Sequence, residues 1–373
     1  MPILSPTLDM SSKEKKYTIR RLHQAEHGSL KAWSAADEYL LAHSKTNEIR
    51  PNHLYLYNDR FGYLACHLHN LSPTLISNYS SQTIAIEKNL KANNLAVIEI
   101  TNPLSDFDRK VDYALIKIPK SLALFQLYLE QIIRNSTENL TVVCAFMTRH
   151  FSPKMIKIAN TYFEDVEQSR AVKKARLIVL KKKKSVSKKE LTKVIEYNGR
   201  SYEQYWGVFS AMHIDYATQF FLDKMEVLET DKCILDLGSG NGIIANEIHK
   251  QFPQREIHLL DDSFLAVASG KLNLQGENIH HHYHHELDIF EDQTFDLIVS
   301  NPPFHFEYEN NIQVAIKLFK ECERCLKTGG NLQVVANKHL NYRTHLSPLF
   351  STVDIIVENS KYVVYKCIKL SVS

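Results

Sequence analysis

The tetrapeptide Asn301-Pro302-Pro303-Phe304 combines residue types that can activate an amine. The exocyclic amine of a nucleobase is a poor nucleophile, because its lone pair is delocalised into the ring. The side-chain oxygen of Asn301 and the carbonyl of Pro302 can each accept one of its N–H bonds, which turns the lone pair towards an electrophile. Pro302 and Pro303 fix φ and lack N–H donors, so the carbonyls stay in place. Phe304 offers a face on which the base can stack.

The apolar segment 295–300 comes directly before this tetrapeptide. Its length and composition predict a buried parallel strand. The tetrapeptide then lies at the carboxyl end of that strand, where open α/β sheets bind their ligands. The alternative interpretation is a plain turn that ends the strand, since Asn-Pro and Pro-Pro are common breakers.

A second chemical motif is the glycine-rich segment that follows the predicted strand 234–237. Glycines spaced as G-x-G-x-G let the backbone adopt positive φ and approach a ligand closely. A dinucleotide fingerprint needs G-x-G-x-x-G, so a pyrophosphate is not the ligand that this spacing favours. The residues that we expect to form the cofactor loop are Asp236, Gly238, Ser239, Gly240 and Gly242.

Acidic residues follow the next two predicted strands. The strand 257–260 ends in Asp261-Asp262, and an acid at the end of the second strand can bind ribose hydroxyls. Alternatively, Asp261 caps the helix that follows. After the third strand, Glu286 and Asp288 are both candidates to accept a hydrogen bond from an adenine amino group, and the sequence leaves the choice open.

Clusters of histidine and cysteine raise the question of a metal site. Successive residues of a strand point to opposite faces, so a run of histidines on one strand cannot converge on one ion. Cys322 and Cys325 form a lone CxxC, whereas a zinc site of that type needs a second pair. We therefore expect no metal site, and six reduced cysteines. The histidines of the run are His280, His281, His282, His284 and His285.

Length and composition set the class of protein. The chain has 373 residues, of which 44% are hydrophobic and 23% charged, which fits two globular domains. No apolar run approaches the ~20 residues that span a bilayer, and the start of the chain lacks a signal-peptide pattern. We expect a cytoplasmic protein. The net charge of +3 is too small to establish a nucleic-acid partner.

A run of nine lysines marks the expected domain boundary, which we place between residues 1–185 and 186–373. The run can be a solvated linker. It can also be a strip that binds phosphates, because lysines gain affinity for a polyanion by releasing its counterions. The lysines are residues 173, 174, 181, 182, 183, 184, 188, 189 and 193.

The two halves of the chain resemble each other, which predicts a duplicated α/β domain with a parallel sheet, as the strand–helix alternation also indicates. The first copy lacks the glycine loop, and Lys117-Ile118-Pro119-Lys120 stands at the place of the tetrapeptide. Chance similarity between two α/β domains is the alternative. The paired segments are 54–62 with 233–240, 112–120 with 296–304, and 140–143 with 332–335.

The glycine loop, Asp261 and the tetrapeptide together resemble the motifs of class I S-adenosylmethionine-dependent methyltransferases that methylate amino nitrogens. Duplicated domains with a degenerate first copy are typical of the ribosomal RNA guanine-N2 methyltransferases. Further segments are similar to the ribosomal RNA large subunit methyltransferase G family within that group. These segments are 30–41, 173–177, 334–340 and 361–364.

This resemblance implies two tandem Rossmann-like methyltransferase domains with seven-stranded, mostly parallel sheets. The first, residues 1–185, would be degenerate and bind RNA or serve as a scaffold. The second, residues 186–373, would bind S-adenosylmethionine and methylate 23S rRNA, free or in an assembling subunit, at the family's site, guanine 1835. The resemblance implies that Asn301 to Phe304 hold the base, and we expect a monomer.

The chain departs from the family pattern ahead of its first catalytic strand. The family usually carries Phe-Ser-Arg and then Leu-Asp-x-Gly, whereas here the segments are Phe209-Ser210-Ala211 and Ile214-Asp215-Tyr216-Ala217. Contacts from this segment are therefore in question. Ser239 replaces a common cysteine in the loop. Other interpretations are a 16S rRNA guanine-N2, adenine-N6 or protein glutamine-N5 methyltransferase, and an RNA-binding scaffold without activity.

Overall fold

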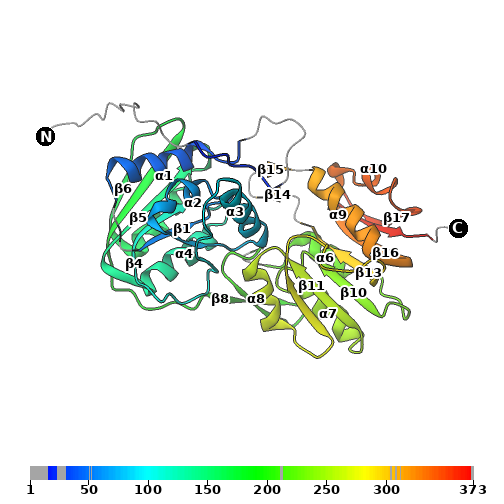
Figure 1. The fold of residues 1–373 in the computed structure, drawn as a ribbon. Helices are drawn as coiled ribbons and strands as arrows, with labels where there is room; N and C mark the ends of the chain where they lie inside the picture. Colours follow the sequence, from blue (N-terminus) through cyan, green and yellow to red (C-terminus); the bar gives the residue numbers. More distant parts are fainter. Residues whose placement is uncertain are drawn as a thin grey trace.

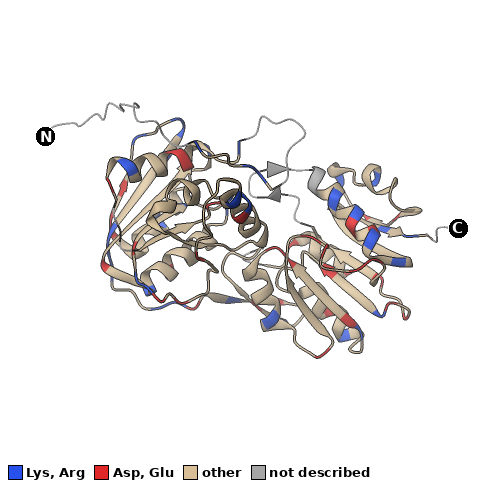
Figure 2. Cartoon of the chain, viewed as in Figure 1, with Lys and Arg blue, Asp and Glu red and all other residues tan. Residues whose placement is uncertain are grey.

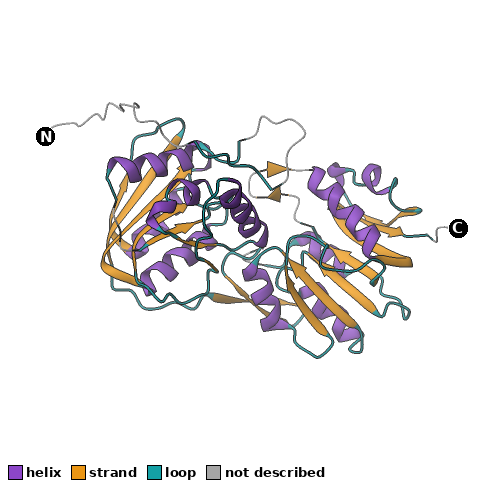
Figure 3. Cartoon of the chain, viewed as in Figure 1, coloured by secondary structure: helices purple, strands orange, loops and turns teal. Residues whose placement is uncertain are grey.

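The computed structural model describes residues 16–22, 31–49, 51, 53–210, 213–302, 305–306, 309–310 and 312–370. Ala211, Pro303 and Phe304, to which the sequence analysis assigned importance, lie outside the described residues. The chain folds into two halves that lie side by side (Figure 1). Each half has a seven-stranded sheet with helices packed on both faces (Figure 3).

The first half runs from the first described helix to the lysine run. Its elements are α1 (Ala35–Thr46), β1 (Leu54–Tyr57), α2 (Tyr63–His67), η1 (His69–Leu71), β2 (Thr74–Ile76), α3 (Ser80–Ala92), β3 (Ile100–Thr101), β4 (Val111–Lys117), α4 (Leu122–Arg134), β5 (Ser136–Met147), η2 (Thr148–His150), α5 (Pro153–Tyr162), β6 (Phe163–Gln168) and β7 (Ala175–Lys183).

A hairpin joins the halves, and the second half follows it. The hairpin consists of β8 (Thr192–Tyr197) and β9 (Arg200–Tyr205). The later elements are α6 (Tyr216–Leu222), β10 (Cys233–Leu237), α7 (Ile243–Gln251), β11 (Glu256–Asp261), α8 (Phe264–Asn273), β12 (Ile279–Tyr283), β13 (Phe295–Ser300), β14 (His305–Phe306), β15 (Glu309–Asn310), α9 (Ile312–Cys325), β16 (Leu326–Asn337), η3 (Lys338–Leu340), α10 (Arg343–Leu346), β17 (Thr352–Glu358) and β18 (Tyr362–Ile368).

The two large sheets have the same strand order. The first is β3-β2-β1-β4-β5-β7-β6 and the second is β12-β11-β10-β13-β16-β18-β17. In both, the first five strands are parallel and the last two are added in antiparallel pairing. The prediction of two tandem α/β domains with mostly parallel sheets is therefore confirmed.

The strand register aligns the two copies residue by residue. In each sheet the central strand pairs with its two neighbours at corresponding positions, which fixes the correspondence. The pairings are Tyr57 with Ile76 and Ile116 in the first sheet, and Leu237 with Leu260 and Ser300 in the second. Lys117 and Asn301 each follow the last residue of their strand that pairs with the central strand, Ile116 and Ser300. These two residues therefore occupy equivalent places.

Each sheet is buried on both faces, which explains the apolar runs in its strands. Along β13, Leu297 and Val299 pack with α6 and α7 on one face, whereas Ile298 packs with α9 on the other. The alternation of side chains places these neighbours on opposite sides. The strand that carries Asn301 at its end is therefore rigidly held.

The hairpin β8–β9 turns at Asn198 and Gly199. Both turn residues have positive φ, 47° and 73°, which suits a two-residue hairpin loop. The hairpin rests on α8, where the backbone N–H of Tyr205 donates to Ser269 Oγ at 3.0 Å.

The halves also join directly through the loops after their second strands. Tyr79 and Ser263 form an antiparallel bridge. Leu265 and Ala266 of α8 belong to the same buried cluster as Tyr57 and Ile116 of the first sheet. In the part of the chain that the structure describes, no helix is long and apolar enough to cross a membrane.

Candidate functional site

The glycine loop connects β10 to α7 and has the conformation that its sequence predicts. Gly238, Gly240 and Gly242 have φ of 73°, 56° and 79°, a region that other residues rarely adopt. A Cβ at Gly242 would lie 3.2 Å from Leu259 Cδ2, so a side chain there would push α7 away from the sheet. A Cβ at Gly240 would meet no atom within 4 Å, so this side of the loop is open.

Asp236 lies under the loop and is fully buried. Its Oδ2 accepts a hydrogen bond from the N–H of Ala245 at 3.1 Å, whereas its Oδ1 has no partner among the described residues. Burial raises the pKa of Asp236 to about 7. A buried carboxylate oxygen without a partner costs free energy, so this atom suits a donor supplied by a ligand.

Asp261 ends β11 and holds the glycine loop from the side. Its Oδ2 accepts from the N–H of Gly240 at 2.9 Å and its Oδ1 accepts from the N–H of Ser263 at 2.8 Å. Burial raises the pKa of Asp261 to about 6. The cap of α8 is Ser263, whose Oγ accepts from the N–H of Ala266, so Asp261 supports this helix start without being its cap.

Asp262 turns away from the loop and contacts the other half of the chain. Its Oδ1 accepts from the N–H of Ser81 at 2.8 Å, and its Oδ2 accepts from Ser81 Oγ at 2.6 Å. The structure therefore gives Asp262 a role at the interface between the halves. Its contact with a cofactor stays a prediction.

The acids after the third strand differ in exposure. Glu286 accepts a hydrogen bond from Lys317 Nζ of α9 at 2.6 Å, and 22% of its side chain is exposed. Asp288 lies 3.4 Å from His284 Nδ1, and 63% of its side chain is exposed. Lys317 thus fixes the carboxylate of Glu286 against α9. Both acids stay predicted contacts of an adenine amino group.

Asn301 directly follows β13, and its amide is held by the start of α6. Its Nδ2 donates to Thr218 Oγ1 at 2.8 Å and to Asp215 Oδ2 at 3.3 Å. Asp215 Oδ2 is already an acceptor for two backbone N–H groups at the start of α6, so the NH2 of Asn301 faces it. The amide is therefore oriented, and its Oδ1 has no donor among the described residues.

Asp215 and Thr218 are site residues that the sequence analysis did not assign. Asp215 is the cap of α6, and its Oδ2 also accepts from the N–H groups of Ala217 and Thr218 at 3.0 and 3.3 Å. An Asp directly before the first residue of a helix was the available sequence signal. What it did not reveal is that this helix start reaches the end of β13.

The sheet brings these groups to one edge. β10 pairs with β11 on one side and with β13 on the other. The carboxyl ends of these parallel strands carry the glycine loop, Asp261 and Asn301, which are therefore neighbours. Pro302 is buried beside them. Pro303 and Phe304 lie outside the described residues, so their predicted roles stay predictions.

The equivalent edge of the first sheet has different chemistry. Lys117 stands at the place of Asn301, and its Nζ donates to the buried Asp37 at 2.8 Å. A lysine ammonium has only donors and cannot accept the N–H of an amine. Two positions of the loop keep positive φ: Asn58, with φ of 59°, at the place of Gly238, and Gly62, with φ of 79°, at the place of Gly242. This edge therefore has no equivalent amine acceptor at that position.

Comparisons with known proteins agree over almost the whole chain. A family model described as the RLMG N-terminal domain matches residues 7–185, and one described as the methyltransferase small domain matches residues 202–366. The ribosomal RNA large subunit methyltransferase G of Pectobacterium atrosepticum is 30% identical over 95% of this chain and 96% of that protein. The protein of the same name from Psychromonas ingrahamii is 29% identical over 96% and 98%.

The chain belongs to the ribosomal RNA large subunit methyltransferase G family. It is an rRNA methyltransferase with S-adenosylmethionine as cofactor, so the resemblance predicted from the motifs is confirmed. A solved structure, the Thermus thermophilus 16S rRNA N2 G1207 methyltransferase in complex with AdoMet and guanosine, superimposes with a TM-score of 0.72 at 20% identity. It covers 90% of this chain and 92% of its own, which supports the duplicated fold.

The cofactor fits the features already described. An open glycine loop lets the backbone approach the ligand, the unpartnered Oδ1 of Asp236 can accept from it, and Asp261 stands beside the loop. These features belong to the second copy, which agrees with the match of residues 202–366 to the methyltransferase small domain.

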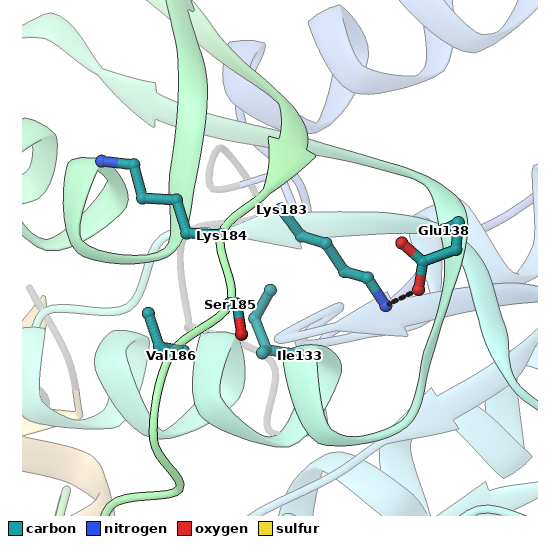
Figure 4. Close-up of a pocket in the computed structure, with 6 residues that line it drawn as sticks. All are labelled: Ile133, Glu138, Lys183, Lys184, Ser185 and Val186. Atoms are coloured by element: carbon teal, nitrogen blue, oxygen red, sulfur yellow. Dashed lines mark ion pairs between the residues drawn. The ribbon is translucent and has the colours of Figure 1, made fainter.

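A pocket of about 420 Å³ in this methyltransferase lies away from that edge, in the first half (Figure 4). Lys183 points across it and pairs with Glu138 at 3.0 Å. Lys184 donates to the carbonyl of Asn160 at 2.8 Å. Both lysines are thus engaged within the protein, and the pocket does not take part in the site. Its lining residues are Ile133, Glu138, Lys183, Lys184, Ser185 and Val186.

Other lysines of the run are also paired with acids. Lys173 lies 3.0 Å from Glu38, and Lys182 lies 3.0 Å from Asp165. In the view of Figure 2, basic and acidic segments alternate over both halves of this family member. The run therefore does not form an unbroken cationic strip, and its binding of RNA phosphates stays a prediction.

Proposed function

We propose that this chain methylates the exocyclic N2 of a guanine in 23S rRNA. The observation that carries the proposal is the orientation of Asn301. Its Nδ2 is committed to Thr218 and Asp215, so its Oδ1 is the atom available to accept an amine N–H. An amine with two N–H bonds is the substrate that this arrangement suits.

The cofactor would lie along the glycine loop of the second copy. Backbone N–H groups between Gly238 and Gly242 approach it, Asp261 accepts from its ribose hydroxyls, and Asp236 Oδ1 accepts from a cationic or hydroxyl donor. Glu286 or Asp288 accepts from the adenine amino group. When bound, S-adenosylmethionine supplies a methyl group on a sulfonium, which is the electrophile.

The protein's own task is to hold the acceptor amine. Asn301 Oδ1 and the Pro302 carbonyl each accept one N–H bond, which fixes the nitrogen and directs its lone pair. As the nitrogen gains a bond and positive charge, the same two oxygens stabilise it until it loses a proton. Pro303 keeps the loop rigid and Phe304 stacks on the base, which must be unpaired or flipped out of its helix.

Two observations support guanine and the large subunit. The relatives are named for the large ribosomal subunit, and the solved neighbour of the same duplicated fold is named for guanine N2 and was determined with guanosine. The first half, residues 1–185, would bind RNA by shape and phosphate contacts, while residues 186–373 catalyse transfer. The enzyme would act in the cytoplasm as a monomer, with guanine 1835 as its target.

Methyl transfer from labelled cofactor tests the proposal. Separate reactions would contain 23S rRNA, 16S rRNA, DNA and a protein release factor, with Asn301→Ala enzyme as the blank. We expect label in 23S rRNA, present as N2-methylguanosine. Label confined to any of the other three acceptors would replace the proposed substrate, and label in N6-methyladenosine would replace the proposed base. No transfer to any acceptor would favour an RNA-binding scaffold.

A further inference from the structure

Three side chains with metal-binding atoms meet at the amino end of the second sheet. Cys233 begins β10, Glu256 begins β11, and His258 lies two residues further along. The Cys233 Sγ, a carboxylate oxygen of Glu256 and a ring nitrogen of His258 all lie within 4.8 Å of one another. This group lies at the opposite end of β10 from the glycine loop.

The sheet register explains why these side chains share a face. Cys233 pairs with Glu256 across parallel strands, so both point to the same side. His258 is two residues after Glu256 and points the same way. Its Nε2 lies 3.2 Å from Glu256 Oε1. Two neighbouring strands therefore supply sulfur, oxygen and nitrogen to one spot.

The third strand, β12, places two histidines beside this group. His280 pairs with His258 in the ladder, and its Nε2 lies 3.5 Å from the same Glu256 Oε1. His282 Nε2 lies 3.0 Å from His258 Nδ1. The alternation of the strand sends His281 to the other face, where its Nε2 contacts the carbonyl of Leu274 at 2.9 Å.

We propose that Cys233, Glu256, His258 and His280 bind a Zn²⁺ ion. Zinc takes four ligands tetrahedrally, with Zn–N and Zn–S bonds of about 2.0 and 2.3 Å, which places neighbouring ligand atoms roughly 3.3–3.8 Å apart. The separations of 3.2 and 3.5 Å between Glu256 Oε1 and the two imidazole Nε2 atoms are close to this range. A thiolate and a carboxylate balance the two charges of the ion.

The surroundings of His258 suit a ligand. When its Nε2 binds the ion, its Nδ1–H donates to His282, which fixes the ring as outer partners of zinc ligands do. The rings of Phe290 and Phe295 stand edge-on to His258 at 5.7 and 5.4 Å, and they make one wall of the site apolar.

This metal site is separate from the site proposed for methyl transfer, which lies at the other end of the strands. Its ligands come from β10, β11 and β12, so the ion would tie together three strands whose other ends hold the cofactor loop and Asp261. All four donors are protein side chains, and zinc sites that are closed in this way are structural. The histidine run and the CxxC, each considered by itself, predicted no metal site, whereas the neighbouring strands complete the ligand set.

Titration of the full-length, metal-free protein with Co²⁺ tests the proposal. Cobalt adopts zinc's tetrahedral geometry and shows a thiolate charge-transfer band when a cysteine is bound. We expect one equivalent of Co²⁺ to give this band, and one equivalent of Zn²⁺ to abolish it. Cys233→Ser should remove the band, His258→Ala should weaken binding at least tenfold, and His282→Ala should weaken it about 10–100-fold.

Control variants separate this site from a chance affinity of surface histidines. His339→Ala removes an exposed histidine of η3 and should leave the titration unchanged. Glu256 is half-exposed, so Glu256→Gln should fold normally, as circular dichroism would check, and should lose affinity and the rise in melting temperature on adding zinc. Absence of Co²⁺ binding, or binding that is the same in Cys233→Ser, His258→Ala and Glu256→Gln, would overturn the proposal.

Discussion

Asn78 and Asp262 occupy equivalent positions in the two halves, each two residues past the last residue of the second strand that pairs with the central strand. Each accepts a hydrogen bond from an N–H in the first turn of a helix of the other half. Asn78 Oδ1 accepts from the N–H of Leu265 in α8 at 3.2 Å. Asp262 Oδ1 accepts from the N–H of Ser81 in α3 at 2.8 Å. The duplication thus produced an interface in which the copies stabilise each other reciprocally.

The backbone of the same loops repeats this reciprocity. The N–H of Ser80 donates to the carbonyl of Asp262 at 2.9 Å, and the N–H of Phe264 donates to the carbonyl of Asn78 at 2.7 Å. Because Asp261 belongs to one of these loops, the first half directly supports the loop that holds the cofactor site. This gives the first copy a structural role.

Asp262→Ala should lower the free energy of unfolding by about 0.5–2 kcal/mol, because α3 loses its cap and the negative charge near its amino end. Chemical denaturation measures the change. Asp262→Asn keeps an acceptor for the N–H of Ser81 and should lose less. Asp354→Ala, an exposed strand residue, is the control. Equal stabilities of Asp262→Ala and Asp354→Ala would disprove the capping role.

Asn301→Ala should reduce kcat for methyl transfer by about 10²–10³-fold, the loss found when one donor that stabilises developing charge is removed from an enzyme. Cofactor affinity should stay within about twofold, because Asn301 lies at the acceptor side of the edge. Single-turnover transfer and calorimetric cofactor binding measure the two quantities. Unchanged turnover would remove Asn301 from the mechanism.

Asp215→Asn should lower kcat by roughly tenfold while the melting temperature changes little. Asn and Asp cap helices about equally well, so α6 is kept. The neutral amide no longer fixes which way the NH2 of Asn301 points, so the acceptor Oδ1 is presented only part of the time. A positioning role predicts this fall in kcat without a matching fall in stability. A parallel loss of both would assign Asp215 to folding alone.

The glycine loop and the strand that ends before Asn301 were predictable from local sequence because their signals are short. A glycine-spaced loop between a strand and a helix, and an apolar strand that ends at Asn-Pro, are each recognised within a few residues. The equivalence of Lys117 and Asn301 followed from internal similarity, and the strand register supports it.

Contacts between distant segments were not predictable in this way. Asp215 and Thr218 reach Asn301 only through the packing of α6 on the sheet. Asp262 is adjacent to Asp261 and shares its type, yet the two carboxylates point to different partners because the chain turns after β11. Neither distinction is present in a single sequence, since both depend on the register and packing of remote elements.

The titration of Asp261 predicts how cofactor binding depends on pH. Burial raises the pKa of Asp261 from its ordinary 3.8 to about 6. Above pH ~6 the carboxylate is ionised and accepts from the ribose hydroxyls, whereas protonation at lower pH removes one acceptor. Cofactor affinity should therefore be full near pH 8 and fall as the pH drops through about 6 towards 5.

The stability of the cofactor-free protein should depend on pH in the opposite direction. A raised pKa means that the folded state binds the proton more tightly than the unfolded state does. Ionisation of Asp261 therefore lowers the stability as the pH rises from about 4 to about 6.

Calorimetric titration of cofactor across this range measures the affinity. Asp261→Asn should bind more weakly at pH 8 and should lose the dependence centred near pH 6. Asp236, with a pKa of about 7, would contribute a separate step, which Asp236→Asn should remove. Asn301→Ala carries no titratable change and should keep the wild-type profile. A profile that Asp261→Asn leaves unaltered would show that another group controls cofactor binding.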